Sequence, residues 1–338
     1  MRFPKIIACA VAGILFLIGA YVGGGGWLVS RELADALRVG APTAQGDGWP
    51  APQGPADIGY AGNPRQAYGY AFDDVALAGE LGAFPAWLTP PATGDLDRPW
   101  AIFVHGIGGR RENGYRFLPT LRDAGYPVLM ISYRNDHDAP ADPGGFYAFG
   151  LTEWRDLDTA VQYARNHGAT SVILVAESMG GGIAGQFLRR SEHAGFVSAI
   201  ALDAPATDFA ATLNDQLEIK GLPLAPVLTR SALWFSGFTM PIRLGDAVTL
   251  EDFARFGKPL YLSHGFIDRV VPVSSSDGLV SRRDATTEYL RTRADHIQSW
   301  KVDPERYEAS FGAWLSSLPG NRAPPPPGNL PLTLPPQG

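Results

Sequence analysis

The chain contains one cysteine and six histidines, so the residues that most often bind transition metals are few and scattered. Cys9 lies alone in an N-terminal apolar run, which excludes a disulfide and a cysteine-based metal site from the folded part. No two histidines form an H-x-x-x-H pair or an HExxH motif, and we expect neither a metal nor another cofactor. The net charge of −6 and the lack of a Lys/Arg cluster argue against nucleic acid as a partner.

Charge is also missing from a long stretch near the N-terminus. Arg2 and Lys5 precede an uncharged run from Ile6 to Ser30, which ends at Arg31. A run of this length crosses a hydrocarbon core of roughly 30 Å as one helix. Because the positive charges precede the run, we predict a single-pass anchor with a cytoplasmic N-terminus. The domain that follows then lies on the extracytoplasmic side of the cell membrane.

Residues 1–30 also fit a cleaved signal peptide, with Ile6 to Ile18 as its apolar region and Ala20 at the cleavage site. The uncharged run is longer than a typical signal core, which favours the retained anchor. In the signal-peptide alternative the mature protein is secreted. Both alternatives place the folded domain outside the cytoplasm.

Two segments have a composition that does not predict a packed core. Residues 31–65 are rich in glycine, proline and alanine without clear periodicity, which predicts a stalk or linker, or a loosely packed entry to the domain. Residues 321–338 contain consecutive prolines from Pro324 to Pro327, which predict a disordered or polyproline-like tail. Residues 66–320 remain for the folded domain.

Short apolar runs and helical patterns alternate within this domain. The runs are dense in Val, Ile and Leu, as in strands buried on both faces of a sheet. They are Trp100–Val104, Pro127–Tyr133, Ser171–Ala176, Val197–Leu202 and Leu260–Ser263. One predicted helix begins at Thr152, its expected N-cap, and stops at Gly168, and another begins at Asp303-Pro304. With two antiparallel strands predicted in residues 72–89, the pattern predicts an α/β fold whose mostly parallel sheet has helices on both faces.

One strand-to-helix junction has the pattern of a nucleophilic serine. In the stretch SVILVAESMGGGI the strand ends at Ala176, Ser178 follows, and glycines open a helix. Acyl-transfer chemistry needs a serine on a sharp turn with small residues two before and two after it, here Ala176 and Gly180. A phosphate-binding loop is excluded because no Gly-Lys-Ser/Thr is present, and a dinucleotide fingerprint because the glycines are contiguous.

The loop after the strand at Trp100–Val104 is the expected site of an oxyanion hole. Two backbone N–H groups can stabilise the negative charge of a tetrahedral intermediate. One donor is expected from Met179, directly after the nucleophile, and the other from Ile107 in the stretch IFVHGIGG. His105 in the same loop is expected to brace it by hydrogen bonding.

A general base and its acid partner are predicted after later strands. The stretch LYLSHGFIDRVVP places Asp268 after a strand, and His296 follows the next strand-like segment. In this order His296 can accept the proton of Ser178 while Asp268 holds the imidazole tautomer. Asp203, at another strand end, is the rival acid. Asp295 adjoins His296 and is not expected to reach its ring.

The other histidines are assigned no chemistry. His264 lies in a Ser-His-Gly turn and is expected to be structural. The remaining three lie in polar loops and are expected to be only solvated; they are His137, His167 and His193.

The chain resembles the α/β-hydrolase family over roughly residues 60–318. The stretches that carry the resemblance as a set are LGAFPAWL, FVHGIGG, ISYRND, GLTEWRDLDTAVQYA, ESMGGGIA, HGFIDRVVP and ADHIQSWKVDPERYEASFGAWL. It is closest to serine esterases and acyl-peptidase-like hydrolases of actinobacterial type. The resemblance implies Ser178 as nucleophile, Asp268 as acid and His296 as base, with Met179 and Ile107 as oxyanion donors.

Two positions depart from the family pattern. Ala176 stands where glycine is usual, and alanine is still small enough for the turn. Glu177 stands where an aromatic residue is often found. It could place negative charge near the site, and its influence on substrate choice stays open.

The segment 204–258 separates two consecutive strands and is too long and too apolar for a plain connection. Part of its apolar surface belongs to ordinary packing. The segment as a whole predicts a helical cap over Ser178 that supplies an acyl or alcohol pocket.

These features predict a serine hydrolase that cleaves a carboxylic ester through an acyl-serine intermediate. The expected partner is a small-molecule or lipid-like acyl substrate. A peptidase, a thioesterase or an acyltransferase would use the same three residues, and the sequence does not separate them. A non-catalytic hydrolase fold that binds a ligand is the alternative from another class.

Overall fold

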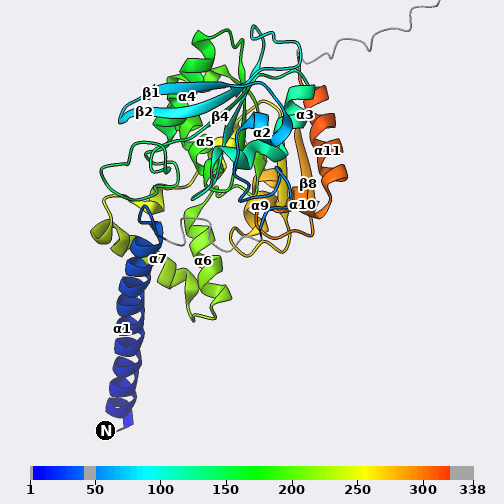
Figure 1. Ribbon diagram of the computed structural model, residues 1–338. Helices are drawn as coiled ribbons and strands as arrows, with labels where there is room; N and C mark the ends of the chain where they lie inside the picture. Colours follow the sequence, from blue (N-terminus) through cyan, green and yellow to red (C-terminus); the bar gives the residue numbers. More distant parts are fainter. Residues whose placement is uncertain (1–2, 42–50, 320–338) are drawn as a thin grey trace, which may run out of the picture.

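The computed structural model describes residues 3–41 and 51–319, in which one eight-stranded sheet forms the centre of the protein (Figure 1). The strand order is β1-β2-β4-β3-β5-β6-β7-β8. The strands are β1 (Asp73–Gly79), β2 (Gly82–Thr89), β3 (Trp100–Val104), β4 (Val128–Ile131), β5 (Val172–Glu177), β6 (Val197–Asp203), β7 (Leu260–Gly265) and β8 (Thr287–Thr292). β1 pairs with β2 and β2 with β4 in antiparallel register, whereas all the other neighbouring strands are parallel to one another.

One face of the sheet is covered by four helices. They are α4 (Trp154–Asn166), α5 (Met179–Arg190), α8 (Leu250–Arg255) and α9 (Val273–Arg282). Alternate strand residues such as Ile102 and Leu174 point into this layer and pack against Leu157 of α4 and Phe187 of α5. These side chains are fully buried, which explains why the central strands are apolar throughout.

The opposite face is covered by α3 (Leu118–Asp123) and α11 (Pro304–Ser317). Phe103 and Tyr261 from the strands pack there with Phe311 and Trp314 of α11. Asp303 caps α11, because its side chain accepts a hydrogen bond from the backbone N–H of Arg306. The shorter elements at the edges are α2 (Pro64–Tyr68), α10 (Ser299–Val302) and the 3₁₀ turns η2 (Arg111–Arg116), η3 (Glu192–Phe196) and η4 (Leu244–Asp246).

The predicted α/β fold with helices on both faces is therefore confirmed, and the predicted strands agree with the observed ones to within a few residues. The N-cap of α4 was predicted wrongly, since Glu153 and not Thr152 precedes its first residue. The Glu153 carboxylate accepts hydrogen bonds from the N–H groups of Ala148 and Gly150, so it ties down the loop before the helix.

The N-terminal region differs from the predicted anchor followed by a stalk. Helix α1 (Phe3–Leu37) continues past Ser30, and residue Arg38 then forms a bridge with Phe146. Farther on, Lys301 pairs with Asp57, so residues 51–65 also lie against the domain. The described residues of the segment 31–65 thus include contacts with the domain, and the predicted tail at 321–338 lies outside the described residues.

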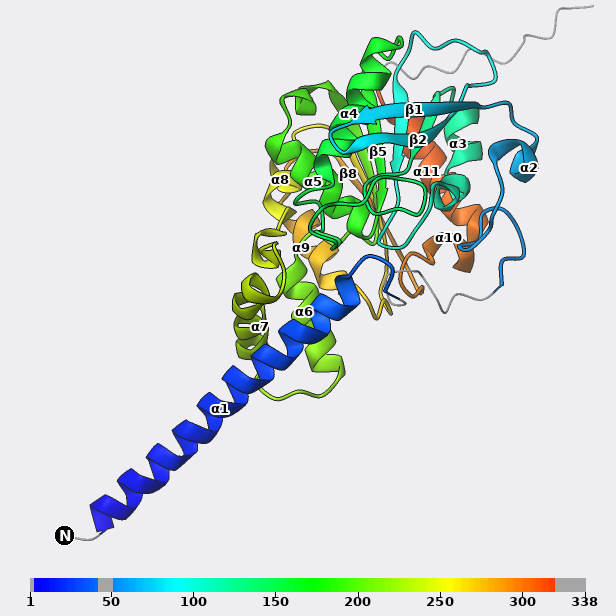
Figure 2. The same cartoon turned by 60° about the vertical axis from the view of Figure 1, so that its left-hand side comes forward.

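The predicted cap insertion between β6 and β7 is present as two helices, α6 (Phe209–Ile219) and α7 (Ala225–Thr239). Figure 2 shows that both leave the domain on the side toward which α1 projects. Residues 250–255 were predicted as part of the cap, but they form α8 and cover the sheet. The cap has its own core, in which Phe209, Leu213 and Leu228 pack with Val29 and Leu37 of α1.

Candidate active site

Ser178 lies on the sharp turn between β5 and α5. Its backbone has φ 48° and ψ −121°, a conformation that side-chain-bearing residues rarely adopt. Three hydrogen bonds hold it: its N–H donates to the Asp203 carbonyl, and its carbonyl accepts from the N–H groups of Gly181 and Ala206. The turn therefore presents the Ser178 side chain above the carboxyl ends of the strands.

Two glycines allow this turn to approach the neighbouring strand. A Cβ atom at Gly180 would lie 2.7 Å from the carbonyl oxygen of His105, and one at Gly106 would lie 2.9 Å from the Cβ of Ser178. Both distances are too short for a side chain. Ala176, the residue in place of the family's usual glycine, is buried in the core at the end of β5, so the alanine is accommodated.

The structure brings the predicted nucleophile, base and acid together. The Nε2 atom of His296 lies 2.8 Å from Oγ of Ser178, and its Nδ1 atom lies 2.8 Å from Oδ2 of Asp268. Ser178 and His296 are each 7% exposed, so both side chains are almost completely buried. We refer to this arrangement as the Ser178–His296–Asp268 chain.

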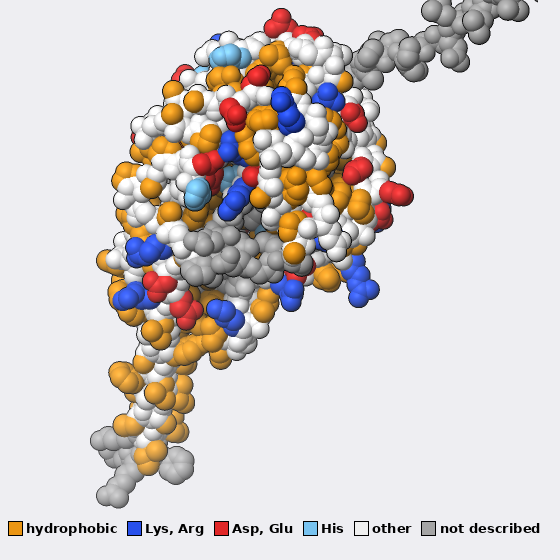
Figure 3. Space-filling view, viewed as in Figure 1, with side chains coloured by type: hydrophobic (Ala, Val, Ile, Leu, Met, Phe, Trp, Pro, Cys, Tyr) orange, Lys and Arg blue, Asp and Glu red, His pale blue; other side chains and the backbone are white. Residues whose placement is uncertain are grey.

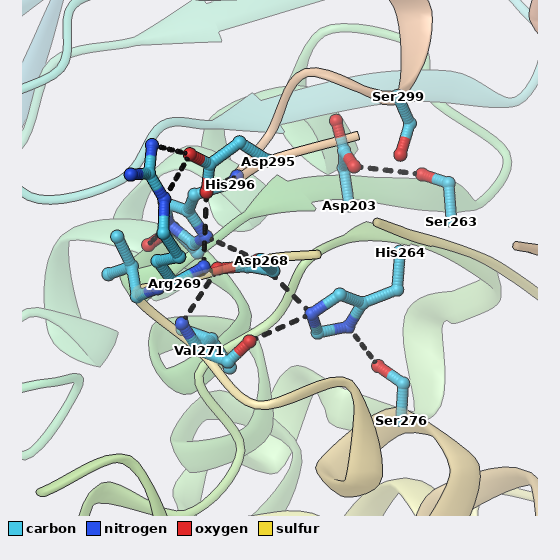
Figure 4. A network of polar contacts seen from close by, with 12 residues as sticks. Asp203, Ser263, His264, Asp268, Arg269, Val271, Ser276, Asp295, His296 and Ser299 are labelled. Carbon is cyan, nitrogen blue, oxygen red and sulfur yellow. Dashed lines mark hydrogen bonds and ion pairs between the residues drawn. The ribbon is translucent and has the colours of Figure 1, made fainter. Parts of the chain in front are cut away.

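The carboxylate of Asp268 is held by further donors on its own loop and on β7 (Figure 4). Its Oδ1 accepts from the backbone N–H groups of Val270 and Val271 at 2.8 and 2.9 Å, and its Oδ2 lies 3.1 Å from Nε2 of His264 as well as beside His296. Burial alone would raise the pKa of the Asp268 carboxyl, but the hydrogen bonds from His264 and His296 outweigh it and hold the pKa well below its ordinary value.

His264 is more than the structural residue that the sequence predicted. Its Nε2 faces two acceptors, the Asp268 carboxylate and the Val271 carbonyl oxygen at 3.1 Å, so this nitrogen carries a proton. Its Nδ1 lies 2.6 Å from the hydroxyl of Ser276. A second histidine therefore supports the acid, and the only sequence signal was its position four residues before Asp268.

The predicted oxyanion donors lie beside Ser178. Gly106, the residue before Ile107, is in contact distance of the serine side chain, and Met179 is the first residue of α5. Within the described parts of the chain neither the Ile107 nor the Met179 N–H has a hydrogen-bond acceptor. The absence of a partner among the described residues is what the prediction of two oxyanion donors requires.

Glu177 does not place free negative charge in the site. It is fully buried and forms an ion pair with Arg116, which also pairs with Asp203 at 3.0 Å. Its Oε1 accepts hydrogen bonds from the Gly106 N–H at 3.2 Å and from the Asn113 amide at 2.8 Å. Burial alone would raise the pKa of Glu177, but the Arg116 charge outweighs it and lowers the pKa.

Asp203, the rival acid, has no contact with His296. Its Oδ2 accepts from Arg116 at 3.0 Å. Its Oδ1 accepts from the Ser263 hydroxyl at 2.9 Å, so both oxygens have partners in the protein interior (Figure 4). Asp295 binds Arg269 and accepts from the backbone N–H of His296, and it does not reach the imidazole.

His105 braces the loop after β3 by hydrogen bonding, as its position in the sequence predicts. Its ring is fully buried, stacks on Tyr133, and contacts the Gly106 carbonyl and the Asp136 carboxylate, each at 2.9 Å. Two of the histidines predicted to be only solvated have partners. His167 contacts the Tyr163 carbonyl, and His193 contacts Asp158.

A cavity of about 630 Å³ opens beside the oxyanion loop. Polar and charged residues line it, including Arg110, Arg111 and Asp138. Ser178, His296 and Asp268 are not among the lining residues. Among the described residues, no three His, Cys, Asp or Glu side chains are grouped so as to hold a metal ion.

Residues 101–331 match the model of the alpha/beta hydrolase family, and the chain belongs to this family. No curated protein matches the chain. An esterase from Pyrococcus furiosus is similar in structure, with a TM-score of 0.59 and 19% sequence identity, over 80% of this chain and 99% of that one.

Two other solved structures are similar to the chain. An esterase from Exiguobacterium antarcticum has a TM-score of 0.54 and 17% identity over 72% of this chain and 100% of its own. A bacterial membrane phospholipase A has a TM-score of 0.52 and 17% identity over 93% of this chain and 97% of its own. At these identities the comparisons establish the fold.

Proposed function

We propose that the protein is a serine hydrolase that cleaves a carboxylic ester, with Ser178 as nucleophile, His296 as general base and Asp268 as the acid that orients it. The observation that carries the proposal is the continuous hydrogen-bonded chain from Ser178 Oγ through His296 to Asp268, at 2.8 Å for each step. The same three residue types in this geometry perform acyl transfer on several unrelated folds.

In the proposed reaction His296 Nε2 takes the proton of Ser178 as Oγ attacks the ester carbonyl carbon. The carbonyl oxygen becomes negative and accepts hydrogen bonds from the Ile107 and Met179 N–H groups. The C–O bond then breaks, and His296 gives its proton to the alcohol that leaves. Water repeats the sequence on the acyl-serine, which releases the carboxylic acid and restores Ser178.

The choice of an ester rests partly on the relatives. Similar structures include esterases from Pyrococcus furiosus and Exiguobacterium antarcticum, and a membrane phospholipase A whose alignment reaches into the N-terminal fifty residues of this chain. These relatives favour an acyl ester, including a lipid-like one. A peptidase, thioesterase or acyltransferase would use the same atoms with another leaving group or acceptor.

The N-terminal helix supports a membrane location for this activity. Residues Ile6–Leu37 of α1 are long and apolar enough to cross a membrane, and the most apolar part of the helix is not buried against the rest of the chain. This part is therefore a membrane anchor or a signal sequence. We infer a retained single-pass anchor, because the uncharged run from Ile6 to Ser30 is longer than a typical signal core. The hydrolase domain then lies on the extracytoplasmic side, because Arg2 and Lys5 precede this run. N-terminal sequencing of the mature protein tests this, and a chain beginning near Tyr21 would contradict it.

A fluorophosphonate probe tests the nucleophile directly, since only an activated serine reacts fast. We expect labelling of the wild type, loss of labelling in Ser178→Ala, and normal labelling in Ser281→Ala, which alters an exposed serine. Turnover of p-nitrophenyl esters should fall by several orders of magnitude in Ser178→Ala alone. Peptide amides and acyl thioesters assayed beside the esters separate the alternative substrates. A folded wild type that neither reacts with the probe nor turns over any of them would support the non-catalytic alternative.

A further inference from the structure

Helix α7 of the cap carries a ridge of large apolar side chains that no other part of the described chain covers. Leu224, Val227, Trp234 and Phe238 are 49%, 41%, 64% and 69% exposed. We call these four residues the cap ridge. The segment from Gly221 to Ile242 contains a single charged residue, Arg230, so the ridge is not flanked by the charges typical of a water-exposed helix.

The cap ridge adjoins the apolar helix α1. Figures 1 and 2 show α7 lying along the half of α1 nearest the domain. The hydroxyl of Tyr21 donates to the Pro223 carbonyl at 2.9 Å, and the Ser231 hydroxyl donates to the Val22 carbonyl at 2.9 Å. Trp27 also contacts Phe235 ring to ring, and hydrophobic side chains gather along the projecting helix α1 (Figure 3).

The depth of these contacts follows from the length of the helix. A hydrocarbon core of roughly 30 Å takes up about 20 helical residues at 1.5 Å each. If the span begins at Ile6, the first residue after Lys5, it ends near Gly25. The contacts at Tyr21 and Val22 are therefore inside this limit. On this basis the start of α7 lies at the level of the hydrocarbon core, and its end lies at the level of the headgroups.

We propose that the cap ridge docks into the bilayer beside α1, so that α7 enters the leaflet on the side of the domain and the cap is held at the lipid surface. Aromatic residues such as Trp234 favour the boundary between hydrocarbon and headgroups, and Arg230 can extend along α7 to a lipid phosphate. The partner is the lipid bilayer rather than a second copy of the chain, because the ridge continues a surface that already belongs to a membrane-spanning helix.

A second exposed apolar group lies next to the Ser178–His296–Asp268 chain. Phe266, Ile267 and Val270 are 49%, 48% and 46% exposed on the loop that carries Asp268. This loop is bound to α6 of the cap, because the Gln216 amide donates to the carbonyls of Arg269 and Val270. Docking of the cap therefore brings the loop that carries Asp268 toward the lipid. Given the proposed function, an ester within the leaflet could reach Ser178 without crossing bulk water.

A fluorescence experiment on the full-length chain tests the docking. In a Cys9→Ser background, Trp234→Cys is labelled with an environment-sensitive dye, and Ala92→Cys, on an exposed loop before β3, is the matched control. Both are reconstituted in vesicles of phosphatidylcholine and phosphatidylglycerol. We expect doxyl-labelled lipid to quench the dye at 234 at least about threefold more than the dye at 92. Equal, weak quenching would overturn the proposal, and so would concentration-dependent cross-linking through position 234 without quenching, which would indicate a second copy.

The quenching measurement is repeated in Ser178→Ala. Its outcome therefore does not depend on whether Ser178 is the nucleophile. For the active protein, Trp234→Glu combined with Phe238→Glu should slow hydrolysis of a vesicle-embedded ester by about tenfold or more, since charge is disfavoured at this depth. Hydrolysis of a short water-soluble ester should stay unchanged. Equal loss on both substrates would point to a folding defect and contradict a role in docking.

Discussion

The carboxylate of Glu177 accepts a hydrogen bond from the backbone N–H of Gly106 at 3.2 Å, which links the residue before the nucleophile to the residue before Ile107. Arg116 donates to the other oxygen of Glu177, so a buried ion pair fixes the position of the Glu177 side chain. The two N–H groups proposed for the oxyanion hole thus belong to segments that Glu177 joins. This gives a structural reason for a buried glutamate at a position where an aromatic residue is often found.

Glu177→Gln should lower kcat by about ten- to a hundredfold with little change in KM. The amide has one acceptor oxygen and no charge, so it cannot serve Gly106, Asn113 and Arg116 together, and the oxyanion loop loses its fixed position. Steady-state kinetics on a soluble ester measures the effect, with Glu192→Gln on the surface as the control. Unchanged kcat in a folded variant would show that Glu177 does not position the loop.

The acid is tested by comparing two buried aspartates. Asp268→Asn should lower kcat by about ten-thousandfold, because the asparagine leaves His296 in the wrong tautomer. Asp203→Asn should have a much milder effect on kcat and a larger one on stability, since Asp203 pairs with Arg116 and not with His296. The reverse order of the two kcat values would assign the acid to β6.

His264 is expected to act by positioning Asp268. His264→Leu removes the donor to Oδ2 and should lower kcat by about tenfold at constant KM. In His264→Gln the new side-chain amide can replace the Nε2 donor, so this variant should restore most of the rate. Fluorophosphonate labelling rates, normalised to folded protein, separate positioning from misfolding. Equal losses in both variants would leave His264 with a packing role only.

The pH dependence of stability follows from the lowered pKa of Asp268. In the unfolded chain this carboxyl has its ordinary pKa of 3.8, and in the folded protein the value is lower. Folding thus favours the charged form, which stabilises the protein fully above about pH 5 and progressively less as pH falls below 3.8. The free-energy advantage of the wild type over Asp268→Asn should shrink by about 2 kcal/mol between pH 6 and pH 2. Urea unfolding at each pH measures it, with Asp95→Asn as the exposed control; a constant difference would contradict the assignment.

Local patterns were sufficient to predict the central strands and the residues that the structure joins at the site. Ser178 follows an apolar strand and precedes contiguous glycines, and both features are visible within thirteen residues. The network around Arg116 was not predictable, because Glu177 lies 61 residues away and no local pattern pairs them. The packing of α1 on the cap joins residues about 200 positions apart, such as Tyr21 and Pro223. Contacts at such separations depend on the whole fold.

The glycines near the end of the apolar part of α1 are expected to serve this long-range contact. Glycines lower the intrinsic stability of a helix. In the structure, however, a Cβ atom at Gly26 would lie 2.6 Å from the Cβ of Ser231. A Cβ atom at Gly24 would meet nothing within 4 Å. Gly26 therefore lets α7 approach α1, as small residues do between membrane helices. Gly26→Ala should cost about 1–3 kcal/mol through overpacking, and Gly24→Ala should be neutral or slightly stabilising. Thermal unfolding of the full-length chain in detergent measures both variants. A Gly26→Ala chain as stable as Gly24→Ala would mean that α1 does not pack on the cap in this way, because only Gly26 faces Ser231.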